Sequence, residues 1–128
     1  MNTKVIFAID DNQDFDKVGI FVRHMRQLNA LGAIESTPTQ CIGYWNGVLE
    51  NSYMMNKTDY DRYVDAFGYT LKQACILIVP PMTRQPCHLA YSDGSTDTLK
   101  PMREVPVKEA YNNNAWTYVV ETGKYFVC

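Results

Sequence analysis

The stretch CIGYWNGVLENSYMM, residues 41–55, holds two runs of strand-forming residues on either side of an Asn-Gly pair. Asn-Gly favours a type I′ turn, because both of its positions need a positive φ, and this turn joins antiparallel strands. In a two-residue hairpin Gly43 pairs with Glu50, so these two residues share a face of the sheet. Their neighbour Tyr44 then points to the opposite face.

Two apolar stripes, one on each side of this hairpin, recur at three- and four-residue steps and predict two amphipathic helices. The stripe residues are Phe15, Val18, Val22, Met25 and Leu28 in the first helix and Tyr60, Tyr63, Val64, Phe67 and Leu71 in the second. Asn12 or Asp14 can cap the first helix. Gly32 fits a left-handed stop at its C-terminal end.

Apolar and β-branched runs predict strands before, between and after these helices. The predicted strands are 4–9, 33–45, 48–55, 74–79, 88–92, 116–121 and 124–128. The run ACILIV (74–79) is nearly all apolar, so we expect a central strand covered on both faces. The segment 98–115 is expected to be irregular, with one helical turn.

The order strand, helix, strand, strand, helix, strand predicts an α+β fold. Its expected form is a ferredoxin-like βαββαβ sandwich, with two helices on one face of a mainly antiparallel sheet. A C-terminal hairpin is appended to this unit. Because the chain has no repeat, linker or low-complexity tract, residues 1–128 are predicted to form a single domain.

Composition narrows the classes of function. The 128 residues are 46% hydrophobic and carry a net charge of −2, which lacks the basic excess that a nucleic-acid-binding face needs. No apolar run approaches the roughly 20 residues of a membrane span. The N-terminal run is followed at once by acids, unlike a secretory signal. The four cysteines match no zinc spacing, so we expect reduced thiols in the cytoplasm.

Other candidate sites have simpler structural explanations. An acidic group follows the first predicted strand and can in principle hold Mg²⁺, but helix capping explains it more simply. Its members are Asp10, Asp11, Asp14 and Asp16. His24 and His88 are interpreted as surface or core histidines. No nucleophile elbow and no glycine-rich phosphate loop is present, and we predict no metal site.

Glu50 has two interpretations. Opposite it lies a glycine, and Trp45 is its diagonal neighbour in the predicted register. An open carboxylate beside an aromatic ring can receive a cation. The alternative is a solvated glutamate on the exposed face of a hairpin, and the pattern alone does not decide between them.

An ordered set of short fragments is similar to the phage S-adenosylmethionine lyases, long described as hydrolases. No fragment is specific by itself, but together they cover residues 5 to 127. The fragments are RHM (23–25), AIEST (33–37), CIGYW (41–45), Glu50 ahead of a strand, QACILIV (73–79), HLAYSDG (88–94), REVP (103–106) and the C-terminal hairpin.

The resemblance implies a homotrimer with active sites between subunits and no cofactor. The implied reaction converts S-adenosylmethionine to 5′-methylthioadenosine and L-homoserine lactone, with the substrate's own carboxylate as nucleophile. Ring closure is intramolecular, so holding the substrate bent supplies much of the rate. Loss of this methyl donor in the host cytoplasm would blunt methylation and restriction by the host.

The resemblance also implies site residues. Glu50 matches the catalytic glutamate of the family and Tyr44 its tyrosine. Because Tyr44 and Glu50 point to opposite faces of the sheet in the two-residue register, Trp45 is an alternative match to the family tyrosine. The family glutamine corresponds to Gln85, or to Met82 if the loop is aligned without a gap.

Two hydroxyl residues of the EST fragment complete the implied set. Ser36 and Thr37 can bind substrate near the site, or they can pack within a strand. Two further functions remain open. One is a phage inhibitor without enzymatic activity that binds a host protein through aromatic residues, and the other is a protein that sequesters the methyl donor without cleaving it.

Overall fold

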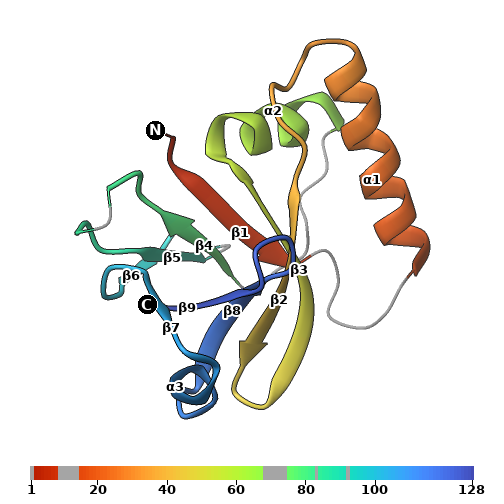
Figure 1. The fold of residues 1–128 in the computed structure, drawn as a ribbon. Helices are drawn as coiled ribbons and strands as arrows, with labels where there is room; N and C mark the ends of the chain where they lie inside the picture. Colours follow the sequence, from red (N-terminus) through yellow and green to blue (C-terminus); the bar gives the residue numbers. More distant parts are fainter. Residues whose placement is uncertain (1, 9–14, 68–74, 83, 92) are drawn as a thin grey trace.

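A computed structural model of the chain describes residues 2–8, 15–67, 75–82, 84–91 and 93–128. Within these ranges the fold is a curled antiparallel sheet of nine strands with three helices (Figure 1). The elements are β1 (Lys4–Ala8), α1 (Phe15–Ala30), β2 (Thr39–Trp45), β3 (Val48–Asn56), α2 (Lys57–Phe67), β4 (Cys75–Val79), β5 (His88–Tyr91), β6 (Thr96–Thr98), β7 (Arg103–Val105), α3 (Val107–Tyr111), β8 (Ala115–Val119) and β9 (Lys124–Val127).

The strand order in the sheet is β6-β5-β4-β1-β3-β2-β8-β9-β7. The four strands of the expected βαββαβ unit are neighbours in it, in the order β4-β1-β3-β2, and every pair among them is antiparallel. The C-terminal hairpin β8–β9 extends the sheet because β8 pairs with β2. The appended hairpin was predicted, but its attachment to β2 was not.

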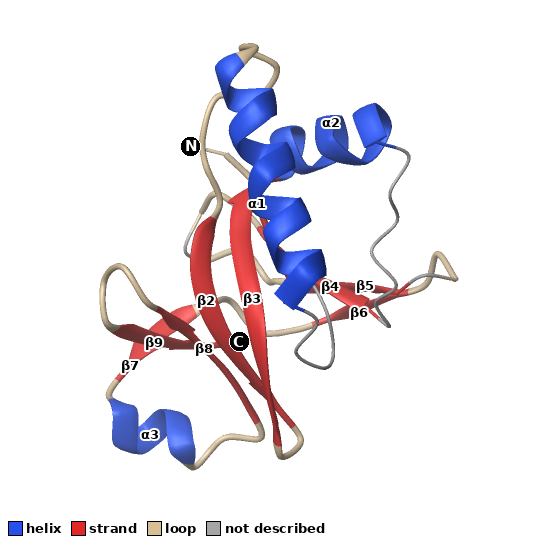
Figure 2. Ribbon diagram, turned by 90° about the vertical axis from the view of Figure 1, so that its right-hand side faces the viewer, coloured by secondary structure: helices blue, strands red, loops and turns tan. Residues whose placement is uncertain are grey.

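Helices α1 and α2 cover one face of the sheet, as expected (Figure 2). Alternate residues of a strand point to opposite faces, and the residues of β1 and β3 on the helix side join the helices in one buried core. The core cluster consists of Val5, Phe7, Phe21, Met25, Leu28, Ile34, Met55 and Tyr63. Gly32, with a φ of 71°, ends α1 in the predicted left-handed conformation.

The β2–β3 hairpin has the predicted register. Gly43 pairs with Glu50, and Tyr44 pairs with Leu49. Asn46 and Gly47 both have positive φ values, 47° and 88°, as a type I′ turn requires. The local turn chemistry therefore decides which side chains share a face with Glu50.

Three predictions about the strands were wrong. The strand expected from residue 33 begins only at Thr39, because Ile34 turns into the core and Ser36 bonds to α2. The segment 98–115 contains α3 but also the short strand β7, and the strand β6 ends at its first residue, Thr98. β4 is not covered by packed structure on both faces: Ile76 packs on the core, whereas Leu77 lines a cavity.

Some sequence predictions fall on residues that the structure does not describe. The helix caps Asn12 and Asp14, the acids Asp10 and Asp11, and Leu71 lie outside the described residues. The side chains of Phe15, Asp16, Val18 and Phe67 lie outside them as well. None of the helices within the described residues is long and apolar enough to cross a membrane.

Candidate functional site

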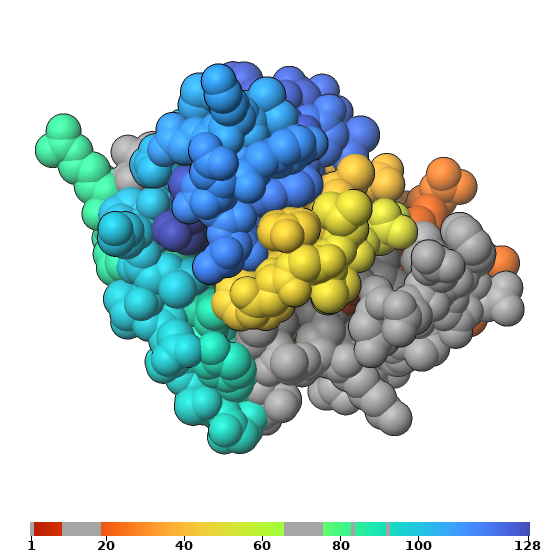
Figure 3. All heavy atoms as spheres, turned by 90° about the horizontal axis from the view of Figure 1, so that it is seen from below, coloured from red at the N-terminus to blue at the C-terminus, as the bar shows by residue number. Residues whose placement is uncertain are grey.

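A cavity of about 480 Å³ lies on the sheet face opposite α1 and α2. Its lining includes Ile6 of β1 and Ser52 of β3, which alternate along their strands with core residues such as Phe7 and Met55. Figure 3 shows the hairpin β2–β3, in yellow, next to the C-terminal residues, in blue. The volume is in the range of small-molecule sites.

The cavity exists because the sheet curls. Leu89 of β5 and Phe126 of β9 both line it, although five strands separate β5 from β9 in the sheet order. At the usual spacing of strands, a flat sheet would hold them about 29 Å apart. Curling brings the two ends together around one concave space, so residues from seven strands face the same ligand volume.

Glu50 lies in this cavity, half-buried on β3. It pairs with Gly43 on β2, and Gly43 pairs in turn with Thr117 on β8. Glu50 has the only charged side chain among the described residues that line the cavity. An acidic group in a mainly apolar cavity favours a ligand that carries positive charge near it.

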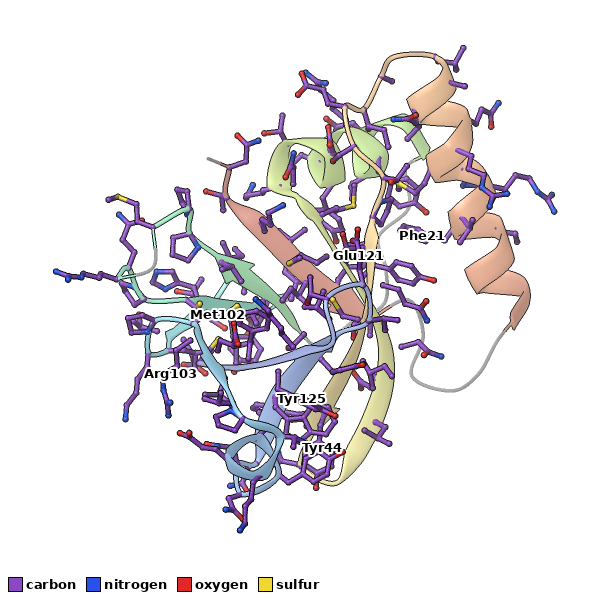
Figure 4. All side chains as sticks on the ribbon, viewed as in Figure 1. Phe21, Tyr44, Met102, Arg103, Glu121 and Tyr125 are labelled. Carbon is purple, nitrogen blue, oxygen red and sulfur yellow. The ribbon has the colours of Figure 1, made fainter. Side chains whose placement is uncertain are left out.

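The two aromatic candidates of the hairpin have different surroundings. The ring of Tyr44 stacks on Trp116, with centroids 5.3 Å apart and planes 10° from parallel. Trp116 also contacts Tyr125, which lies beside Tyr44 in Figure 4. Both residues border the cavity, but the register places the Tyr44 side chain on the face of the sheet opposite Glu50, whereas Trp45 shares the face of Glu50 and is 51% exposed. Of these two rings, that of Trp45 is therefore the one on the same side of the sheet as Glu50.

Gln85 and Met82 lie together but not beside Glu50. Both are exposed, and the backbone N–H of Gln85 donates to the carbonyl of Met82 at 3.2 Å. They line a second, smaller cavity of about 170 Å³. Phe126 borders both cavities, so the two spaces are neighbours within one chain.

Ser36 and Thr37 line neither cavity. The Ser36 hydroxyl donates to the Asp59 carboxylate at 2.9 Å, and the backbone N–H of Glu35 donates to the same carboxylate at 3.3 Å. Asp59 is 2% exposed in the first turn of α2. In this chain Ser36 therefore holds the α1–β2 connection against α2.

Two residues of the cavity were missed from the sequence. Ser52 and Thr117 are 4% and 8% exposed, and both line the cavity. Ser52 lies two residues after Glu50 on the same strand, so the alternation of the strand was a signal that could have found it. Thr117 depends on the pairing of β2 with β8, for which the sequence carries no local signal.

The thiols near the cavity are protonated at neutral pH. Burial is the main cause that raises the pKa of Cys128, which lines the cavity, to about 12, and the neighbouring Cys87 adds to the shift. Burial also raises the pKa of Cys41 on β2 to about 11. Neither thiol supplies a reactive thiolate or a second negative charge under physiological conditions.

Comparison with known proteins gives one match for the chain. Residues 12–128 match the model of the S-adenosylmethionine lyase family. No curated protein matches the sequence. The matched range includes every strand of the cavity except β1.

Proposed function

The chain belongs to the S-adenosylmethionine lyase family, and on that premise we propose that it cleaves S-adenosylmethionine to 5′-methylthioadenosine and L-homoserine lactone. The observation that carries the proposal is Glu50, the one charged side chain among the described residues of a largely apolar cavity of about 480 Å³. The substrate brings two positive groups, a sulfonium and an ammonium. A single carboxylate attracts both, and the apolar lining offers surface to the adenine.

The proposed reaction needs no proton transfer. The α-carboxylate oxygen attacks the γ-carbon, the bond from that carbon to sulfur breaks, and its electron pair leaves with sulfur as a neutral thioether. Carboxylate and sulfonium charges disappear together, while the ammonium keeps its proton. The protein's task is to hold the methionine chain bent so that the oxygen and the γ-carbon meet.

We propose that Glu50 binds the ammonium and so holds this bent conformation. Trp45 can cover the sulfonium with its ring face, which is the cation–π geometry. Tyr44 supports the site from the other face of the sheet through its stack on Trp116. This assignment gives the aromatic contact to Trp45 and a positioning role to Tyr44.

Gln85, Ser36 and Thr37 remain proposed substrate-binding residues only in an assembly. None lines the cavity of its own chain, so each would reach a substrate there from a neighbouring subunit. A homotrimer with sites between subunits, as the resemblance implies, would provide this arrangement. The βαββαβ unit would then follow the ferredoxin-like plan, which its strand order β4-β1-β3-β2 supports. No cofactor takes part in the proposed reaction.

In an infected cell the activity would lower the methyl donor in the cytoplasm and weaken methylation-dependent restriction. The rival function is an inhibitor that binds a host protein without catalysis. Exposed side chains near the hairpin tip and on α3 favour it: Trp45 is 51% exposed, and Leu49 and Tyr111 are each 63% exposed. Sequestration of the methyl donor without cleavage is a third function, which predicts binding and no products.

The test is to mix purified protein with S-adenosylmethionine and follow the products by proton NMR. Methylthioadenosine and homoserine lactone should appear together, faster than by spontaneous breakdown. Glu50→Gln should lower kcat/KM by at least about a hundredfold, since an interaction with a charged group in a site of low polarity is lost. Glu121→Gln, on an exposed turn that does not line the cavity, is the matched control and should keep full activity.

Each other outcome selects a different function. Homoserine that appears before any lactone would mean that water is the nucleophile. Intact substrate that is bound tightly would support sequestration. Intact substrate that is not bound would exclude the enzyme and direct the search to a host protein that contacts the exposed hairpin.

A further inference from the structure

The cavity wall has no side chain at Gly43, between Glu50 and Thr117, and we call this gap the notch. The three residues form one row across β3, β2 and β8, because Gly43 pairs directly with both of the others. Directly paired residues share a face. The backbones of Glu50 and Thr117 are two strand spacings apart, about 10 Å, with only a glycine between them.

Gly43 keeps this notch open. A Cβ atom at Gly43 would lie 3.1 Å from the Ser52 hydroxyl oxygen and 3.9 Å from the Glu50 carbonyl oxygen. The first of these distances is shorter than ordinary van der Waals contact. Gly43 does not have a positive φ, in contrast to Gly47 in the turn. The position therefore does not need glycine for its backbone, and what glycine provides there is space beside the Ser52 hydroxyl.

The hydroxyls of two buried residues border the same notch. Ser52 and Thr117 are each more than nine-tenths buried and line the cavity. Neither hydroxyl bonds to another described residue, and both oxygen atoms are open to the cavity instead of fully buried. Two open donors on one cavity wall suit a polar ligand group such as a carboxylate.

We propose that the notch over Gly43 binds the amino-acid end of the substrate, with the ammonium toward Glu50 and the α-carboxylate toward the hydroxyls of Thr117 and Ser52. This inference rests on the proposed function and adds residues that orient the nucleophile. Hydroxyl donors at one wall and a carboxylate at the other match the opposite charges of an α-amino acid. Ser52 and Thr117 are positioning residues here, because they hold the attacking carboxylate and transfer no proton.

The arrangement also predicts which groups of a ligand the notch recognises. A ligand without the carboxylate loses the Thr117 and Ser52 contacts but keeps the ammonium contact with Glu50. A ligand without the whole amino-acid end leaves the notch empty. Three stable probes separate these cases: S-adenosylhomocysteine, which has both groups; decarboxylated S-adenosylmethionine, which keeps the amine; and methylthioadenosine, which has neither.

The experiment measures the affinity of each probe by calorimetry with the full chain. Thr117→Val removes the hydroxyl at nearly constant shape and should weaken S-adenosylhomocysteine about tenfold, the usual loss for a hydrogen bond to a charged group. It should leave the other two probes within about twofold. Ser52→Ala should act in the same direction, and Thr117→Ser should restore most of the affinity.

Gly43→Ala tests the space itself. The added methyl should weaken both probes that carry the amine and leave methylthioadenosine unchanged. Gly19→Ala is the matched control, since nothing lies within 4 Å of a Cβ at that helical position. Circular dichroism of each variant identifies loss of fold, and Thr117→Ser and Ser52→Ala keep the test decisive if another variant does not fold.

The outcomes separate this inference from the proposed function. Suppose that the wild-type protein cleaves S-adenosylmethionine, but Thr117→Val and Ser52→Ala lower the affinity for all three probes equally, or for none. The notch assignment is then wrong, and the proposed lyase activity is unaffected. If the wild-type protein neither cleaves the substrate nor binds any probe, both the notch assignment and the proposed function are wrong. Selective loss of S-adenosylhomocysteine, together with a raised KM for S-adenosylmethionine, supports the assignment.

Discussion

Replacing Ser36 by alanine should lower the stability of the fold and leave the chemistry of the cavity intact. The Ser36 hydroxyl donates to the Asp59 carboxylate at 2.9 Å, and Asp59 is 2% exposed. A hydrogen bond to a charged group contributes about 1.5–3 kcal/mol. Because Ser36 itself is only half-buried, we expect the lower end of that range, about 1.5 kcal/mol, and a fall in Tm of roughly 5 °C.

The assay is urea unfolding followed by circular dichroism, at one protein concentration, since any oligomer adds to apparent stability. Thr37→Ala is the control. Thr37 is exposed, so its loss should change the unfolding free energy by less than about 0.5 kcal/mol. A double-mutant cycle of Ser36→Ala with Asp59→Ala should recover a coupling energy of about 1.5 kcal/mol.

Kinetics then distinguish the two roles of Ser36. If it only holds the α1–β2 connection, Ser36→Ala leaves kcat and KM for S-adenosylmethionine unchanged at temperatures where the variant is folded. An unchanged unfolding free energy with a raised KM would refute the reasoning. That result would mean that the hydroxyl reaches substrate in the cavity of a neighbouring subunit.

Two other predictions concern the core and the thiols. Phe21→Ala should lower the free energy of unfolding by about 3–5 kcal/mol, because Phe21 is 2% exposed and its ring centroid lies 5.6 Å from that of Phe7. The control is Ile20→Ala, at a 47% exposed position, which should lower it by less than about 1 kcal/mol. Cys128, whose pKa is raised from 9.0 to about 12, keeps its proton at pH 8.5. Its alkylation by iodoacetamide, followed by peptide mass spectrometry, should be at least about a hundredfold slower than in urea-unfolded protein, and equal rates would contradict the burial of this thiol.

The fold was predictable where the determining chemistry is local. Asn46-Gly47 specified the hairpin and its register, because a type I′ turn needs two positive φ values in sequence. Gly32 specified the end of α1 for the same reason. Strands β6 and β7 were not predicted. Each has only three residues, and β7 is held by pairing with β9, far along the chain, instead of by its own apolar pattern.

The candidate site was likewise predictable only where it depends on the local turn. The two-residue turn predicts Glu50 opposite Gly43 and Tyr44 on the other face, and the pairing of β2 with β3 has this arrangement. The curl of the sheet was beyond the sequence pattern, because it arises from the pairing of β8 with β2 and the summed twist of nine strands. Without the curl, neither the cavity nor the place of Thr117 in it follows from the sequence.

The charges of the cavity match the demands of the proposed reaction better than those of a hydrolysis. A water nucleophile would call for a general base with a second group to return the proton. Among the described residues that line the cavity, no other side chain is a carboxylate, imidazole or amine that could share proton transfer with Glu50, and the thiol of Cys128 stays protonated. Ring closure by the substrate's own carboxylate moves no proton, so one fixed negative charge and donors that orient the nucleophile are sufficient. On this reasoning the rate should depend on how tightly the amino-acid end is held.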